Sequence, residues 1–249
     1  MEHLRVEHRD AVAVVTLVDL ERRNAMTATM VDEIVETFDA LEADESVGAV
    51  VITGAPPAFC SGADVAALGS LSEERTEGGR RSITSIYEGF LRVLRSTLPT
   101  VAAVNGPAVG AGMNLALACN VRIAGESARF DTRFLRIGLH PGGGHAWLLD
   151  RAVGPQAAAA MMLFGTRIDG ARAAEIGLAW ACHPDAELVD RAVEFAAGAA
   201  AVPRELSAAA VATLREAPWQ PDFDAAVAAE VARQAWSLGQ GWFRPQSGH

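Results

Sequence analysis

The stretch TVAAVNGPAVGAGMNLALAC, residues 100–119, decides the architecture of this chain. Its first part, Val101 to Val104, is a short apolar run that stops at Gly106-Pro107, as a buried strand does. Small residues and glycines fill 108–112, and 113–119 then has the pattern of a helix of small, apolar residues. A buried strand, a tight glycine loop and a helix N-terminus leave several backbone N–H groups without acceptors. Together with the helix dipole, these groups favour an anion or a developing oxyanion.

Composition limits the classes of protein to which the chain can belong. Its 249 residues are 50% hydrophobic and 21% charged, which is enough to bury a large core. The net charge of -10 argues against non-specific binding to nucleic acid or to an anionic membrane, and no apolar run reaches membrane-spanning length. The three cysteines lack metal-ligand spacing and no signal peptide is evident. We therefore expect a cytoplasmic protein without a metal site.

A β/α pattern covers roughly the first three-quarters of the chain. A helix that begins near Thr27 or Thr29 is predicted, because either residue can cap the apolar positions that follow at helical spacing. Residues 71–81 are polar and glycine-containing, which favours a mobile loop. Apolar β-branched runs predict strands, the clearest at 12–18 and 49–53. From residue 186 onward the pattern is helical, and helices are expected at 188–201, 205–216 and 223–238.

A second loop shares the design of the glycine loop. Residues 60–64, Cys-Ser-Gly-Ala-Asp, follow a predicted strand with small side chains at a turn, as Gly110-Ala111-Gly112 do. Backbone N–H groups that converge from the two loops would polarise a carbonyl oxygen, and one such donor contributes about 10²–10³ in rate to acyl chemistry. Both loops can equally be ordinary turns that need glycine. A dinucleotide site is disfavoured because Leu115 stands where the third glycine of G-x-G-x-x-G belongs.

Taken together, these segments resemble the crotonase superfamily, the enoyl-CoA hydratase/isomerase family. Residues 59–65, FCSGADV, resemble its first oxyanion-hole loop, and 105–112, NGPAVGAG, look like its second. Residues 22–26, RRNAM, resemble its early R-N-A-L segment, and 173–178, AAEIGL, match its A-x-E-x-G-L segment. The resemblance runs in order along nearly the whole chain, which makes it far more specific than a single glycine loop.

The resemblance implies an α/β fold of the crotonase type, a spiral of ββα units in residues 1–195. A C-terminal helical region in residues 196–249 would trimerise, giving a homotrimer or a dimer of trimers. The implied ligand is an acyl-CoA thioester. Coenzyme A would then enter as part of the substrate, and no permanently bound cofactor is expected.

The resemblance also assigns roles to individual residues of the acyl-CoA site. The thioester oxygen would lie between the backbone N–H groups of Ala63 and Ala111. Arg22 would lie near the anionic nucleotide end, where it supplies positive charge that the acidic chain otherwise lacks. Backbone groups around Ser61 and Asp64 would hold adenine and pantetheine. Without the resemblance, Arg22 can equally be a solvated arginine of a turn. Asp64 can likewise be an aspartate that caps a turn.

The groups for proton transfer depart from the family pattern. The resemblance places the two glutamates of family hydratases at Asn114 and Phe134, and neither side chain can exchange a proton as a general acid or base. His140 and His145 lie in the loop expected beside the acyl carbons, where a histidine could act as general base and Asp131 could orient it.

Two functions follow from this departure. The first is a non-standard lyase, hydratase, isomerase or hydrolase that stabilises an enolate in the oxyanion hole. The second is a catalytically silent acyl-CoA binding or carrier protein, in which the two histidines are only structural.

Overall fold

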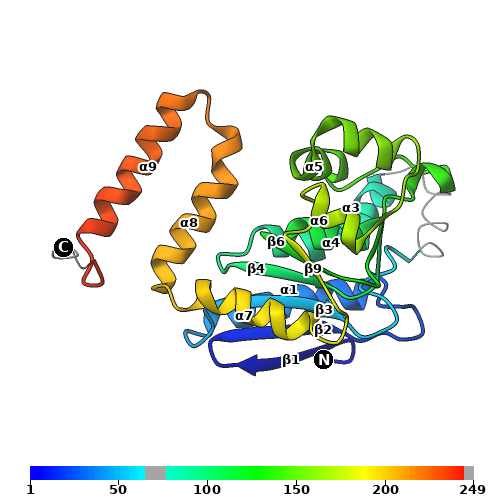
Figure 1. The fold of residues 1–249 in the computed structure, drawn as a ribbon, viewed down its shortest axis with the longest axis horizontal. Helices are drawn as coiled ribbons and strands as arrows, with labels where there is room; N and C mark the ends of the chain where they lie inside the picture. The colour runs from blue at the N-terminus through cyan, green and yellow to red at the C-terminus, as the bar shows by residue number, and fades with distance from the viewer. Residues whose placement is uncertain (65–76, 244–249) are drawn as a thin grey trace.

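The protein, in a computed structural model, is described for residues 1–64 and 77–243 (Figure 1). A six-stranded sheet has the order β1-β2-β3-β4-β6-β9, and a three-stranded sheet has the order β5-β7-β8. Strand β1 runs antiparallel to β2, and the remaining pairs of the larger sheet are parallel. The strands are β1 (Leu4–Arg9), β2 (Val12–Leu17), β3 (Ala49–Gly54), β4 (Thr100–Val104), β5 (Pro107–Val109), β6 (Val121–Gly125), β7 (Arg129–Asp131), β8 (Ile168–Asp169) and β9 (Ala181–His183).

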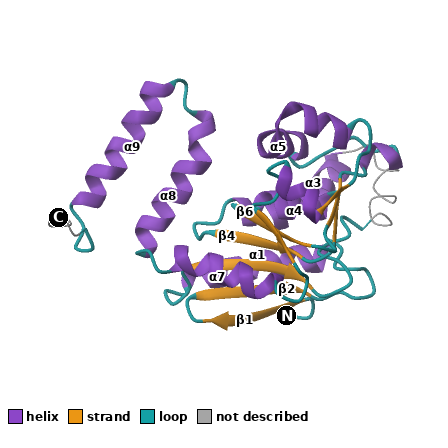
Figure 2. Cartoon of the chain, viewed as in Figure 1, coloured by secondary structure: helices purple, strands orange, loops and turns teal. Residues whose placement is uncertain are grey.

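Helices cover the larger sheet and extend beyond it (Figure 2). The Thr27 hydroxyl accepts a hydrogen bond from Met30 N at 3.2 Å, so Thr27 rather than Thr29 caps the first helix. The helices are α1 (Ala28–Ala43), α3 (Glu77–Leu94), α4 (Ala111–Ala118), α5 (His145–Met162), α6 (Gly170–Glu175), α7 (Leu188–Ala200), α8 (Arg204–Glu216) and α9 (Phe223–Leu238), with short 3₁₀ turns η1 (Phe134–Ile137) and η2 (Ala217–Trp219).

Both faces of the larger sheet are buried, which explains its continuous apolar strands. Alternate residues of β2, β3 and β4, among them Val15, Ile52 and Ala102, pack with α1, α3 and α4 in the main core. The residues between them pack with Leu188 and Ala192 of α7 on the opposite face. The sheet therefore lies between two helical layers, and the loops after β3 and β4 leave it at the same edge, as parallel strands require.

The mobile loop predicted at 71–81 is wrong over residues 77–81, which form the first turns of α3. Later turns of this helix bury Phe90 and Val93, and this packing stabilises the helix despite the glycines in its first turn. Residues 71–76 of that prediction, and Val65 of the first loop motif, lie outside the described residues.

The predicted C-terminal helices are confirmed to within a residue or two at each end. The expected boundary between the spiral core and the C-terminal helical region, at residue 195, lies within α7. This helix packs on the sheet along its length, through Leu188, Ala192 and Ala196. Helices α8 and α9 stand to one side of the core (Figure 1). They expose large apolar side chains, including Leu214, Phe223, Val231 and Leu238. No helix in the described ranges is both long and apolar enough to span a membrane.

Candidate active site

Two loops meet through a single backbone bridge between Cys60 and Ala108. Cys60 N donates to Pro107 O at 3.1 Å, and Val109 N donates to Cys60 O at 3.0 Å. The contact is so close that a Cβ placed on Gly112 would lie 2.2 Å from Cys60 O. Glycine at 112 is therefore a packing requirement of the paired loops.

The pairing brings Ala63 and Ala111 to one cavity, and both residues line it. Gly62 has φ +105°, and a Cβ built on it would lie 3.8 Å from Ala111 N. The N–H of Gly110 donates to Asp131 O at 2.9 Å. The next N–H along the chain belongs to Ala111, the first residue of α4. Neither the Ala63 nor the Ala111 N–H has an acceptor within residues 1–64 and 77–243. Two residues whose N–H groups lack an acceptor in the described chain thus line the same cavity.

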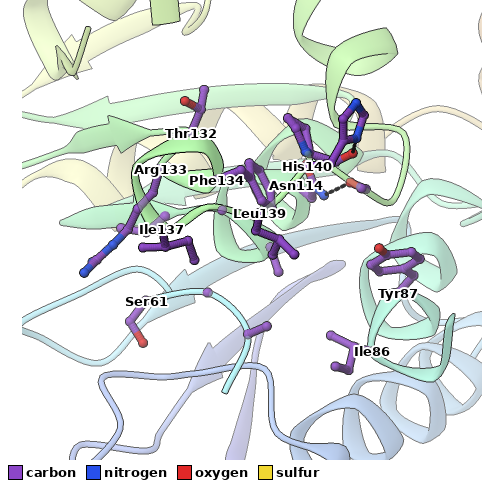
Figure 3. Close-up of a pocket in the computed structure, with 17 residues that line it drawn as sticks. Ser61, Ile86, Tyr87, Asn114, Thr132, Arg133, Phe134, Ile137, Leu139 and His140 are labelled. Carbon is purple, nitrogen blue, oxygen red and sulfur yellow. Dashed lines mark hydrogen bonds between the residues drawn. The ribbon is translucent and has the colours of Figure 1, made fainter. Parts of the chain in front are cut away.

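The cavity has a volume of about 410 Å³ and is largely apolar (Figure 3). Ile86 and Tyr87 of α3 form one side, opposite the turn that carries Phe134, Ile137 and Leu139. Ser61 lies at the other end of the view from Tyr87. An apolar chain fits this lining, with polar groups at only a few places.

The buried Asn24 and the partly buried Asn105 hold the loops in position, and their role could not be recognised from the sequence pattern. Asn24 Nδ2 donates to Ala55 O at 2.9 Å and to Ala58 O at 2.8 Å. Asn105 Nδ2 donates to Gly54 O at 2.7 Å. Each amide bonds to backbone groups beside β3, where the first loop begins, and so satisfies buried carbonyl groups that would otherwise be unpaired. The only available signal was that each precedes a small residue in a motif segment.

His145 is 1% exposed and pairs with Asn114. Asn114 Nδ2 donates to Gly142 O at 3.1 Å, so its Oδ1 faces His145 Nδ1, 2.6 Å away. That nitrogen must carry the proton, which leaves Nε2 as a bare, buried acceptor without a partner in the described chain. Burial lowers the pKa of His145 to about 4. His145 is thus neutral, is bonded to Asn114 and is not among the described residues that line the cavity. This burial does not support the role of general base that the sequence predicted for it.

His140, by contrast, lines the cavity and is exposed. Its Nδ1 lies 2.7 Å from Pro141 O, which can only accept, so Nδ1 carries a proton and the lone pair of the neutral ring is on Nε2. The predicted pairing of Asp131 with a histidine is wrong. The Asp131 carboxylate is ion-paired with Arg136 and, at 3.2 Å, with Arg167 Nε, because β8 brings Arg167 beside β7.

With this geometry established, comparisons with known proteins give a consistent result. A family model described as enoyl-CoA hydratase/isomerase matches residues 7–234. The chain belongs to the enoyl-CoA hydratase/isomerase family. A probable enoyl-CoA hydratase of Mycobacterium tuberculosis (strain ATCC 25618 / H37Rv) is 50% identical over 204 residues, covering 82% of this chain and 78% of that protein. The family predicted from the loop motifs is therefore confirmed.

Solved structures of the enoyl-CoA hydratase/isomerase family confirm the fold as well. An enoyl-CoA hydratase from Polaromonas sp. JS666 has a TM-score of 0.89 at 26% identity, covering 95% of this chain and 92% of that one. A protein from Thermobifida fusca YX, solved in complex with acetoacetyl-CoA, has a TM-score of 0.85 at 32% identity, covering 95% and 94%. The predicted crotonase-type fold is thus confirmed.

The residues that the family resemblance assigned to the coenzyme A end lie beside the first loop. Ser61 Oγ donates to Arg22 O at 2.7 Å, which joins the two segments. The Arg22 side chain is 51% exposed and lies 3.4 Å from Asp19 Oδ2. Ser61 lines the cavity, and Asp64 ends the described part of the loop. The segment with the exposed Arg22 is therefore joined through its backbone to Ser61 of the cavity lining.

Cys60 carries the thiol of the first loop, and this thiol is not activated. The thiol is fully buried, and burial raises its pKa to about 12. It packs in the main core as a small apolar residue.

Proposed function

We propose that this member of the family is an enzyme that polarises the thioester carbonyl of an acyl-CoA between Ala63 N and Ala111 N. The observation that supports the proposal is that one apolar cavity is lined by residues of two paired loops, Ala63 and Ala111, whose backbone N–H groups lack acceptors in the described chain. Donors fixed by the fold stabilise an enolate or tetrahedral oxyanion without reorganising during the reaction. Arg22 and backbone groups around Ser61 and Asp64 would hold the coenzyme A moiety.

His140 is the proposed proton-transfer group. Its Nδ1 is held by Pro141 O, so Nε2 can take a proton from the carbon next to the thioester while electrons move onto the thioester oxygen. The same nitrogen can return the proton to another atom. His145 would act only by orienting Asn114, since its ring is buried and bonded to that amide.

The reaction class is open within the family, because the chain is 32% identical over 207 residues to a 4-chlorobenzoyl coenzyme A dehalogenase of Arthrobacter sp.. Incubation with a panel of enoyl-CoA, β-ketoacyl-CoA and aryl-CoA thioesters, followed by mass spectrometry of the products, identifies the class. We expect product from at least one thioester, and loss of about tenfold or more of that rate in His140→Ala.

Ala111→Pro is the sharpest variant for the oxyanion donor. Proline is tolerated at the first residue of a helix, and Ala111 holds that position in α4, so the substitution removes the N–H with little change in fold. We expect the turnover to fall about 10²–10³-fold while acyl-CoA binding is retained. Unchanged turnover in a folded Ala111→Pro protein would contradict the oxyanion assignment.

A silent acyl-CoA carrier is the alternative, and one observation favours it. No aspartate or glutamate is among the described residues that line the cavity, and the Asn114 amide is bonded to Gly142 and His145. Saturable binding of thioesters without product from any of them would support the carrier.

We also propose that α8 and α9 mediate assembly into a homotrimer or a dimer of trimers. Their exposed apolar side chains, Phe223 at 80% and Leu214 at 71%, are costly to leave in water. Sedimentation equilibrium tests this, and a monomer at micromolar concentration would contradict it.

A further inference from the structure

Tyr87 is the only tyrosine of the chain, and its hydroxyl belongs to the candidate site. The ring lies on α3 and packs against Phe90, with centroids 5.6 Å apart. A Cβ built on Gly142 would lie 2.2 Å from the Tyr87 oxygen, so this oxygen rests directly against the Gly142 backbone. Gly142 O in turn accepts from Asn114, one helical turn beyond Ala111. These contacts place the hydroxyl across the cavity from Ser61 (Figure 3).

The Tyr87 hydroxyl has no hydrogen-bond partner within the described ranges. It is also not among the buried polar atoms that lack a partner there, which are His145 Nε2 and Trp242 Nε1. The oxygen is therefore not fully buried, and in the cavity that Tyr87 lines it is accessible to water or to a ligand. Partial burial raises the pKa of Tyr87, so the group is a neutral donor at physiological pH.

Apolar side chains share the cavity with the Tyr87 hydroxyl, so the affinity for a ligand depends on whether that ligand pairs with the hydroxyl. Ile86, Phe134 and Leu139 line the same cavity and offer no side-chain acceptor. A plain hydrocarbon chain that reached Tyr87 would displace water and leave the hydroxyl unpaired, a loss worth about tenfold to a hundredfold in affinity. A chain that carries an oxygen there keeps the hydrogen bond. The site is thus built to distinguish the two kinds of acyl group.

The charge around Tyr87 favours a neutral oxygen over a carboxylate. Arg133 is the only arginine among the described residues that line the cavity, and it points away from Tyr87 in Figure 3. A carboxylate at the hydroxyl would be desolvated without a guanidinium beside it, which is costly.

We propose that Tyr87 is a specificity-determining residue that donates a hydrogen bond to a carbonyl or hydroxyl oxygen of the acyl group beyond the thioester. It selects oxygen-bearing acyl-CoA thioesters over plain hydrocarbon ones. This inference rests on the proposed binding of acyl-CoA at the oxyanion loops.

Calorimetric titration of the full chain with matched thioesters tests it. The ligands are butyryl-CoA with acetoacetyl-CoA, and hexanoyl-CoA with analogues that carry a ketone on the third or the fifth carbon. In the wild type we expect at least one ketone to bind about tenfold tighter than its hydrocarbon partner. In Tyr87→Phe, which removes only the hydroxyl, that ratio should fall to about one through weaker binding of the ketone.

Ile86→Val is the matched control, because it trims the same cavity from the same helix and leaves the hydroxyl in place. It should keep the ketone preference. A second readout uses the single tyrosine: with tyrosine labelled at Cζ, the one resonance should shift differently for a ketone and for its hydrocarbon partner.

The outcomes separate the two proposals. If no thioester binds, the proposed function fails and this inference falls with it. If thioesters bind but the ketone preference is absent, or survives in Tyr87→Phe, the proposed function stands and the role of Tyr87 is overturned.

Discussion

His145 Nδ1 lies 2.6 Å from Asn114 Oδ1, and this one hydrogen bond joins the first residue of α5 to the first turn of α4. The same amide bonds Gly142 O, so the glycine segment 142–144 is held against the helix that carries the Ala111 donor. Phe134 packs edge-on against the His145 ring, with centroids 4.9 Å apart. The two positions where the resemblance places family glutamates are thus both occupied by neutral groups around a buried, neutral histidine.

Acid should destabilise the protein through His145 before its carboxylates titrate. The folded pKa is about 4, below the ordinary value of 6.5 that the unfolded chain regains. Stability from this group is therefore complete above pH 6.5 and is lost as the pH falls toward 4, by about 3 kcal/mol in all. Urea unfolding at a series of pH values measures it.

His145→Gln is the control for this prediction, because glutamine keeps a donor for Asn114 and does not titrate in this range. The difference in unfolding free energy between wild type and variant should shrink as the pH falls from 6.5 to 4. A difference that stays constant over that range would show that His145 is not the source.

Gly112→Ala should separate the two loops. The new Cβ would lie 2.2 Å from Cys60 O, a backbone atom that moves only with its loop. We expect the unfolding free energy to fall by about 1–3 kcal/mol. Acyl-CoA turnover should fall as well, by more than that loss of stability explains. Gly198→Ala is the matched control, since nothing lies within 4 Å of its Cβ in the interior of α7. It should stabilise by about 0.5–1 kcal/mol. Equal stabilisation of both variants would contradict the close approach of the loops.

Much of the fold could be predicted from the sequence because its signals are local. The continuous apolar runs at β2, β3 and β4 reflect burial on both faces of the sheet, and three C-terminal helices have clear periodicity and proline boundaries. The apolar spacing from residue 83 to residue 94 predicted the body of α3, but its start at Glu77 could not be predicted, because tertiary packing of Phe90 stabilises the helix through polar, glycine-containing turns.

The candidate site was harder to predict, since its contacts are long-range. The small residues and glycines predicted turns at the two loops, which the structure pairs through Cys60 and Ala108. The partners of Asp131 depended instead on β8 bringing Arg167 beside β7. Burial of His145 could not be seen either, because a histidine after three glycines has the pattern of an exposed loop. Tyr87 stood among apolar residues at helical spacing, so its hydroxyl had no local signal in the sequence.

Alkylation should distinguish the three cysteines. Cys60 and Cys119 are buried, and burial raises the pKa of both thiols to about 12. Cys182 is only partly buried, although its pKa is also raised. Because the thiolate is the reactive form, iodoacetamide should modify Cys182 first in the native protein and all three in urea. Peptide mass spectrometry after a time course measures this, and early modification of Cys60 would contradict the closed packing of the first loop.

Asp131→Asn tests whether Asp131 holds the site together or tunes a histidine. The Asp131 carboxylate is buried and ion-paired with Arg136 and Arg167, while its backbone oxygen accepts from Gly110 N. The variant keeps the side-chain volume and removes the charge, so we expect a loss of about 1–2 kcal/mol in unfolding free energy, limited by the exposure of both arginines. The pH profile of turnover should keep its midpoint, since neither His140 nor His145 is bonded to this carboxylate in the described structure. A shifted pH midpoint in Asp131→Asn would show that Asp131 does orient a histidine. An unshifted midpoint with a lower unfolding free energy would show that Asp131 supports the second loop.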